Sequence, residues 1–115
     1  DLDFLTAAVL LTRVVSKPTS NRLCLDLGHK AVASEMNPPR VVFLNLEAAT
    51  PVMHSEEHLV VEVPDGGAYP VGTCVYGVPW HVCPTVALHA RVGVVRDGVA
   101  VDRWEVTARQ RALTV

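Results

Sequence analysis

His81 and Cys83 place an imidazole and a thiol two positions apart, between Pro79 and Pro84. Prolines restrict the backbone, and in an extended segment residues i and i+2 project to the same side. Both side chains could therefore reach one ion at bond lengths of about 2.0 to 2.3 Å. Nitrogen and sulfur donors favour zinc over magnesium or calcium, and two protein ligands leave coordination positions open for substrate. The alternative interpretation of this spacing is a packed cysteine beside a half-buried histidine.

A second group of titratable side chains occupies segment 55–58, with the sequence Ser-Glu-Glu-His, directly before an apolar run. Glu57 and His58 are candidate acid–base groups, since a carboxylate or an imidazole near a bound substrate can transfer protons. The alternative is a solvated entrance to a strand, and the sequence favours neither interpretation over the other.

The remaining histidines receive structural interpretations. Asp26 and His29 flank Gly28, a residue that adopts positive φ angles at no steric cost, so this segment predicts a tight structural turn. His54 and His89 are predicted to be surface residues. Nothing in their spacing places them with the first two groups.

Short β-branched runs bounded by Pro, Gly, Asn and Asp recur along the chain, whereas helical periodicity is hard to find. This pattern predicts an all-β, barrel-like domain. Strands are expected at 5–15, 22–27, 40–46, 58–63, 73–78, 90–96 and 99–106. Asp97-Gly98 joins the last two and predicts a type I′ hairpin, with the strand after it more buried on one face. Segment 29–35 is expected to form at most a short turn of helix, because two prolines soon follow it.

The composition narrows the classes of function. A chain of 115 residues with 50% hydrophobic residues fits one domain with a real core. Ten Lys and Arg stand against twelve Asp and Glu without a run of like charges, so no nucleic-acid partner is expected. The longest apolar run, 7–11, is far shorter than the roughly 20 residues of a membrane span. Three cysteines, an odd number at low density, favour a cytoplasmic location.

Segment 79–85, Pro-Trp-His-Val-Cys-Pro-Thr, resembles the Pro-x-His-x-Cys-Pro-Thr segment of the family of D-serine dehydratases and D-threonine aldolases. Segments 11–17, 25–31, 55–58 and 103–109 resemble further blocks of that family in the same order. Several blocks in order cover almost the whole chain. Trp80 is a departure, since a smaller polar residue is expected there, and it would narrow the substrate pocket.

The resemblance implies a fold-type III, alanine racemase-like enzyme. Its N-terminal (β/α) barrel holds pyridoxal phosphate on a lysine, and a C-terminal β domain closes the active site. Residues 1–115 are then expected to be that single β domain, without the barrel and inactive in isolation. Neither Lys17 nor Lys30 matches the cofactor lysine of the family. The implied partners are the protein's own barrel domain, a small D-amino-acid substrate and a second subunit of a homodimer, with no membrane.

The resemblance also implies that His81 and Cys83 bind zinc or another divalent metal. In the family the matching His and Cys bind zinc in D-serine dehydratases, whereas D-threonine aldolases have an aspartate in place of the cysteine. Cys83 therefore favours a dehydratase-like lyase that converts a D-3-hydroxy amino acid to a keto acid plus ammonia. One alternative is aldolase-like cleavage to glycine plus an aldehyde. Another, from a different class, is a non-catalytic all-β binding module.

Overall fold

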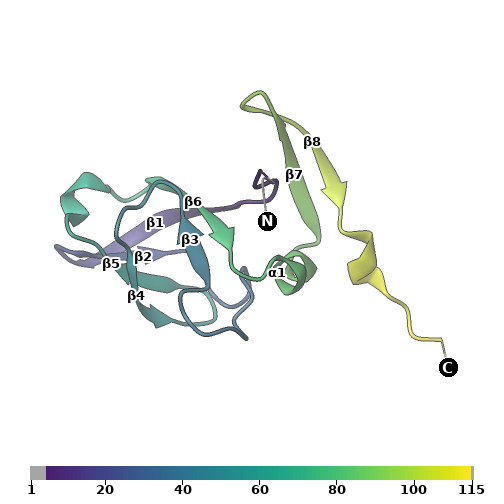
Figure 1. Ribbon diagram of the computed structural model, residues 1–115, viewed down its shortest axis with the longest axis horizontal. Helices are drawn as coiled ribbons and strands as arrows, with labels where there is room; N and C mark the ends of the chain where they lie inside the picture. Colours follow the sequence, from purple (N-terminus) through teal and green to yellow (C-terminus); the bar gives the residue numbers. More distant parts are fainter. Residues whose placement is uncertain (1–4, 115) are drawn as a thin grey trace.

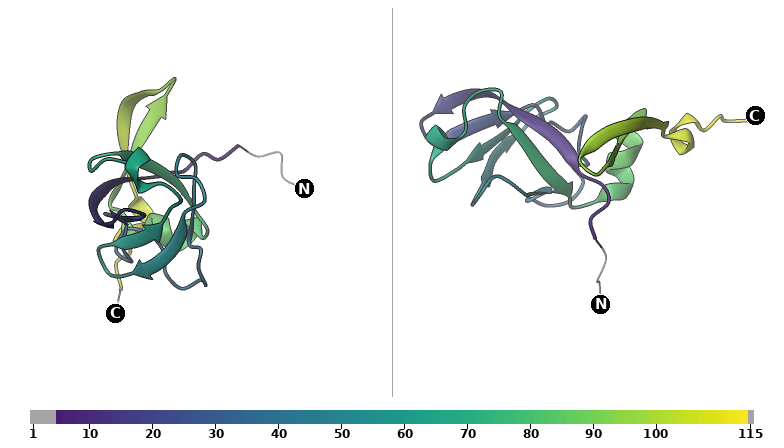
Figure 2. Two further views of the ribbon diagram at one scale, coloured as in Figure 1. Left: turned by 90° about the vertical axis from the view of Figure 1, so that its left-hand side faces the viewer. Right: turned by 90° about the horizontal axis from the view of Figure 1, so that it is seen from above.

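The computed structural model describes residues 5–114, so residues 1–4 and 115 of the predicted domain lie outside it. Six antiparallel strands form one curled sheet in the order β3-β6-β1-β2-β5-β4 (Figures 1 and 2). They are β1 (Leu10–Thr19), β2 (Arg22–Leu25), β3 (Val41–Phe43), β4 (Thr50–His54), β5 (Leu59–Glu62) and β6 (Cys74–Pro79). The prediction of an all-β, barrel-like domain is confirmed. Within residues 5–114, no helix has the length and apolar character needed to cross a membrane.

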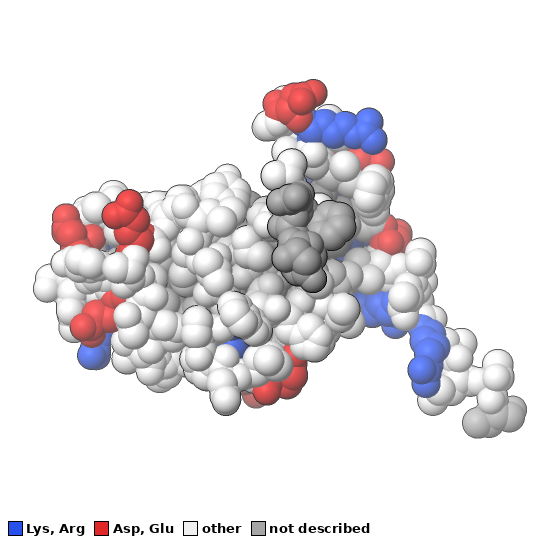
Figure 3. Space-filling view, viewed as in Figure 1, with Lys and Arg blue, Asp and Glu red and all other residues white. Residues whose placement is uncertain are grey.

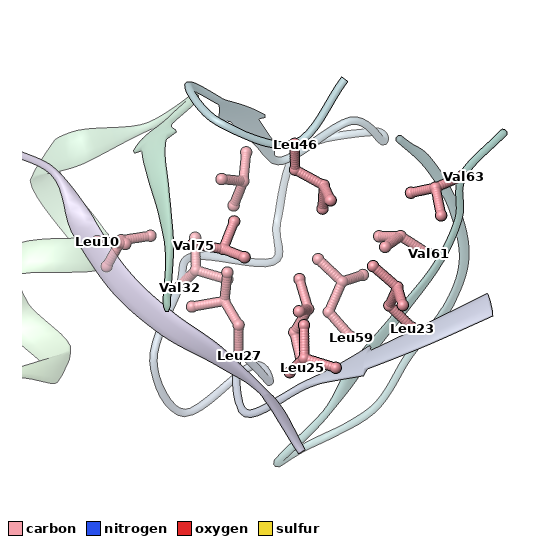
Figure 4. Packing of buried hydrophobic residues seen from close by; sticks show 12 residues of the cluster. Leu10, Leu23, Leu25, Leu27, Val32, Leu46, Leu59, Val61, Val63 and Val75 are labelled. Carbon is pink, nitrogen blue, oxygen red and sulfur yellow. The ribbon is translucent and has the colours of Figure 1, made fainter. Parts of the chain in front are cut away.

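The concave side of the sheet encloses the hydrophobic core (Figure 4). Strand β1 shows how the sequence specifies it, because Leu10, Thr12 and Val14 are buried and alternate with exposed residues at the strand period of two. The core cluster comprises Leu10, Val14, Leu23, Leu25, Leu27, Val32, Val41, Leu46, Leu59, Val61, Val63 and Val75. The hydroxyl of buried Thr12 donates a hydrogen bond of 2.6 Å to Asp26 Oδ1, which satisfies its polar group.

Strands β7 (Arg91–Arg96) and β8 (Val99–Glu105) form a separate hairpin that projects from the body of the domain (Figure 1). Asp97 and Gly98 have φ angles of 49° and 76°, which confirms the predicted positive-φ turn. The prediction that one face of β8 is more buried is wrong, since every residue of β8 is exposed. Trp104 and Val95 remain 56% and 64% exposed. The apolar side chains of this hairpin therefore lack a core of their own.

The structure also contains two elements that the sequence pattern missed. Strand β4 includes Pro51, and it is tolerated because β4 lies at the edge of the sheet, where one side needs no ladder hydrogen bonds. Helix α1 (Val82–Leu88) contains Pro84, which its first turn accommodates because the N–H groups there lack intrahelical partners. Segment 29–35 forms a hydrogen-bonded turn without a helix. The 3₁₀ turns η1 (Gly66–Ala68) and η2 (Thr107–Gln110) complete the chain.

Candidate metal centre

His81 and Cys83 lie at the junction between β6 and α1. His81 is the N-cap of the helix, with extended backbone angles of φ −121° and ψ 98°, whereas Cys83 belongs to the first helical turn. The prediction that both residues share an extended segment is therefore wrong, because the helix begins between them. Both side chains are exposed, and that of His81 retains 47% of its accessible surface. An ion can therefore reach both side chains, as a metal site requires.

Two hydrogen-bonding side chains fix helix α1 to the turn that follows Gly28. The buried hydroxyl of Thr85 donates to His81 O at 2.8 Å and accepts the Ala33 N–H at 3.1 Å. At the other end of the helix, His89 Nε2 donates to Ala31 O at 2.8 Å. His89 is thus a partly buried anchor of the helix, and its predicted surface role is wrong. These bonds hold the backbone of His81 in one place.

Glu35 contributes a contact to His81 that no pattern in the sequence predicts. Its Oε1 meets His81 Nδ1, although 46 positions separate the two residues. The pKa of the Glu35 carboxyl is lowered by hydrogen bonds from its own backbone N–H and from His81, so the group is an ionised acceptor at neutral pH. An ionised carboxylate only accepts hydrogen bonds, so the proton of this contact lies on His81 Nδ1. In the neutral imidazole, Nε2 is then the nitrogen with a free lone pair.

The donor set suits a zinc ion. His81 Nε2 offers a borderline nitrogen and Cys83 offers a soft sulfur, the two ligand types that zinc prefers. Among residues 5–114, no three His, Cys, Asp or Glu side chains converge in a way that could hold a metal. A metal bound here would therefore take its remaining ligands from substrate, water or another polypeptide segment.

Trp80 lies beside this pair and is 60% exposed. It lines a groove of about 390 Å³ together with Thr6, Ala7, Ala8, Val78, Pro79 and Val82. Apolar side chains make up most of this lining, so the groove suits the aliphatic part of a small molecule better than a charged group. The bulk of Trp80 thus occupies the wall of a groove next to the candidate metal ligands.

Glu57 and His58 lie in the turn between β4 and β5. Glu57 Oε1 accepts a hydrogen bond from Lys30 Nζ at 2.5 Å, and the His58 N–H donates to Ser55 Oγ at 3.2 Å. The imidazole of His58 is exposed. No hydrogen bond or ion pair among residues 5–114 links this turn to His81. Within the described part of the chain, the two predicted groups of titratable residues are therefore not joined directly.

Gly28 is needed for a reason other than the one predicted. Gly28 is absent from the residues with positive φ, so that prediction is wrong. Instead, a Cβ atom at Gly28 would lie 2.1 Å from the carbonyl oxygen of Glu56. The backbone of the β4–β5 turn packs directly on Gly28, where His29 N donates to Ser55 O at 2.9 Å and Lys30 N donates to Glu56 O at 3.1 Å. The close approach of the two backbones leaves no room for a Cβ atom and therefore requires glycine at position 28.

His54, predicted to be a surface residue, belongs instead to a partly buried cluster with His29 and Arg40. Its Nε2 lies 2.9 Å from Leu27 O and must donate, whereas its Nδ1 lies 3.1 Å from an Arg40 nitrogen and must accept. The two imidazole rings meet edge to face with centroids 4.4 Å apart. These contacts define a neutral imidazole. Burial, with further contributions from His29 and Arg40, lowers the pKa of His54.

The lowered pKa of His54 predicts acid sensitivity of the fold. As the pH falls below about 6.5, His54 takes up a proton in the unfolded chain before it does so in the folded protein. The contribution of neutral His54 to stability is therefore complete above that pH and decreases as the pH approaches its lower folded pKa. His54→Gln keeps a donor for Leu27 O but does not titrate, so we expect it to lose less stability than the wild type between about pH 7.5 and 5.5. Urea unfolding at about pH 7.5 and 5.5 measures the free energy of unfolding of both proteins. If the wild type and His54→Gln lost equal stability between the two pH values, the lowered pKa of His54 would be contradicted.

Comparison with solved structures defines the class of this domain. A D-threonine aldolase from Filomicrobium marinum matches with a TM-score of 0.84 and 27% identity, over 95% of this chain and 30% of that protein. An alanine racemase-like protein from Idiomarina loihiensis shares the fold, with a TM-score of 0.68 and 22% identity over 84% of this chain. The domain therefore has an alanine racemase-like fold.

The chain belongs to the family described as putative serine dehydratase domain, which matches residues 7–95. A D-threonine aldolase of Arthrobacter sp. is 39% identical over 109 residues, covering 94% of this chain but 28% of that protein. An uncharacterized protein of Mycobacterium tuberculosis is 35% identical over 113 residues, covering 95% of this chain and 85% of that protein. The family inferred from segment 79–85 is thus confirmed, and the chain spans less than a third of the aldolases it matches.

Proposed function

We propose that this chain is the C-terminal β domain of a pyridoxal-phosphate- and metal-dependent lyase that acts on D-3-hydroxy amino acids in the manner of a D-serine dehydratase. The observation that carries the proposal is the accessible imidazole and thiol at the β6–α1 junction, in a chain that belongs to the serine dehydratase domain family. The D-threonine aldolases among its relatives support enzymatic chemistry on D-amino acids.

The proposed roles of the residues follow from their contacts. His81 Nε2 and the Cys83 thiolate would hold zinc, and Trp80 with the apolar groove would line the space beside it. Glu57, held by Lys30, and the exposed His58 are proposed acid–base groups. When bound, zinc supplies Lewis acidity toward the departing hydroxyl, and pyridoxal phosphate on the barrel supplies the electron sink at Cα.

The β7–β8 hairpin supports a role for the proposed partner, the barrel of the same protein. Its exposed apolar residues include Val95, Val99, Val101 and Trp104. Exposed apolar side chains on a hairpin that projects from the body of a domain mark an interaction surface. This domain matches 30% of the aldolase from Filomicrobium marinum, so 70% of that protein lies outside the match. We further propose that the protein is a homodimer, and that it lies in the cytoplasm, a location that its three free cysteines support.

Aldolase-like cleavage is the second candidate within the lyases. Two relatives, both D-threonine aldolases, favour it, whereas Cys83 favours the dehydratase. The two reactions break different bonds. A dehydratase removes the β-hydroxyl and releases ammonia and a keto acid, and an aldolase breaks the Cα–Cβ bond and releases glycine and an aldehyde.

A binding module without catalytic activity is the candidate from another class. The mycobacterial relative favours it, because the domain already covers 85% of that protein. The remainder is too short for a (β/α) barrel, which takes about 200 residues or more. Domains of this family therefore occur in a chain that cannot contain the barrel.

Product analysis separates the three candidates. The protein in its native length, supplied with pyridoxal phosphate and zinc, is incubated with D-serine and with D-threonine. Ammonia with pyruvate or 2-oxobutanoate would establish the dehydratase, and glycine with acetaldehyde from D-threonine would establish the aldolase. Absence of both product sets from correctly folded protein would reject the lyase and favour the binding module.

A further inference from the structure

The contact between Glu35 and His81 has a chemical consequence beyond an ion pair. A neutral imidazole carries its proton on either nitrogen, and only the other nitrogen can bind a metal. Because the Glu35 carboxylate contacts Nδ1, it selects the form in which Nε2 has the free lone pair. Metal-binding histidines commonly donate their second ring N–H to a carboxylate, which fixes both the tautomer and the orientation of the ring.

The position of Glu35 is set by the same contacts that set the position of His81. Thr85 Oγ1 bonds to His81 O on one side and to Ala33 N, two residues before Glu35, on the other. On the far side of Glu35, Arg40 Nε donates to Met36 O at 2.8 Å. The carboxylate and the imidazole are therefore held on backbone segments that one buried hydroxyl connects.

We propose that Glu35 is a positioning residue that holds the proton of His81 on Nδ1 and directs Nε2 toward a divalent metal of the zinc class. The inference rests on the proposed metal site and adds to it a carboxylate that does not itself bind the ion. Glu35 stands apart from the His-x-Cys segment in the sequence, and only the fold brings the two together. In a simple ion pair the imidazolium would carry protons on both nitrogens, so the contact would select no tautomer.

The tautomer can be measured on the metal-free chain by ¹⁵N chemical shifts of the His81 ring. At about pH 8, where an ordinary imidazole is neutral, we expect the wild type to carry its proton on Nδ1. Glu35→Ala should return His81 toward the Nε2–H form that a solvated imidazole prefers. Glu35→Gln, whose amide oxygen still accepts a hydrogen bond, should largely keep the wild-type form. Identical His81 shifts in the wild type and Glu35→Ala would overturn the proposal.

Metal affinity tests the second half of the proposal with the same variants. Cobalt(II), which replaces zinc and reports thiolate binding by its absorption, is titrated into the chain and then displaced by zinc. Glu35→Ala should bind zinc about 10- to 100-fold more weakly, and exposed Glu47→Gln, the matched carboxylate control, should bind as the wild type does. Unchanged affinity in Glu35→Ala overturns the positioning role. If the wild type binds no metal at all, the proposed metal site fails with this inference, whatever the tautomer measurement shows.

Discussion

Replacement of His81 by alanine should abolish zinc binding by this chain. In the proposed site, His81 and Cys83 are the two protein donors, and removal of either would leave a single donor that cannot compete with water for the ion. We expect the affinity for zinc to fall by more than the ~100-fold upper limit for loss of an outer hydrogen-bonding partner. Cys83→Ala should have an equally large effect and should also remove the sulfur-to-cobalt absorption band. Titration with cobalt followed by zinc measures both.

The matched control for Cys83 is Cys74, which is also exposed and free. Cys74→Ala removes a thiol of similar accessibility from the start of β6, and its zinc affinity should equal that of the wild type. If Cys74→Ala weakened binding as much as Cys83→Ala, the metal would be held by accessible thiols in general. In a protein of native length with lyase activity, the His81 variant should lose its dependence on zinc while retaining the absorbance of pyridoxal phosphate. Activity that survives a chelator in the wild type would count against the site.

Gly28→Ala should destabilise the fold severely. The new Cβ would lie 2.1 Å from Glu56 O and 2.3 Å from Glu57 N, and both are backbone atoms that cannot rotate away. We expect a loss of about 3 kcal/mol or more in the free energy of unfolding, at the upper end of overpacking effects. For a domain of this size, that loss lowers the midpoint of thermal unfolding by roughly 10 °C or more. Urea and thermal unfolding, followed by circular dichroism, measure both quantities.

Gly93→Ala provides the comparison within the same chain. No atom lies within 4 Å of a Cβ built at Gly93 in strand β7, and its φ is not positive. This substitution should change the free energy of unfolding by less than about 1 kcal/mol, and a small gain is expected from reduced freedom of the unfolded chain. Equal losses in the two variants would show that the packing of the β4–β5 turn on Gly28 is not what requires glycine there.

Local patterns in the sequence predicted the secondary-structure elements that depend mainly on neighbouring residues. A β-branched run indicated a strand at 5–15, which overlaps β1, and Asp97-Gly98 indicated the β7–β8 hairpin, because strand preference and positive φ depend on adjacent residues. Helix α1 was missed because Pro84 reads as a breaker, although the first turn of a helix accepts proline. The ordered segments resembling one family predicted the fold class as a whole.

Contacts between distant segments could not be predicted in this way. Glu35 reaches His81 only because Thr85 joins their two segments, and the cluster of His54 with Arg40 depends on how the loop before β3 closes on the sheet. Gly28 was identified as special, but for the wrong physical reason, because the atom that excludes a Cβ belongs to Glu56. One sequence contains no direct record of such pairings.

In most small domains the same elements supply both the core and the exposed surface. The β7–β8 hairpin supplies surface without contributing to the core. Among the described residues, the hairpin supplies none of the side chains of the core cluster. Substitutions on it therefore leave the packing that holds the sheet together unchanged. Evolution can alter the exposed side chains of this hairpin without a compensating change in the interior. Such independence suits a module found both in long aldolases and in a short mycobacterial protein.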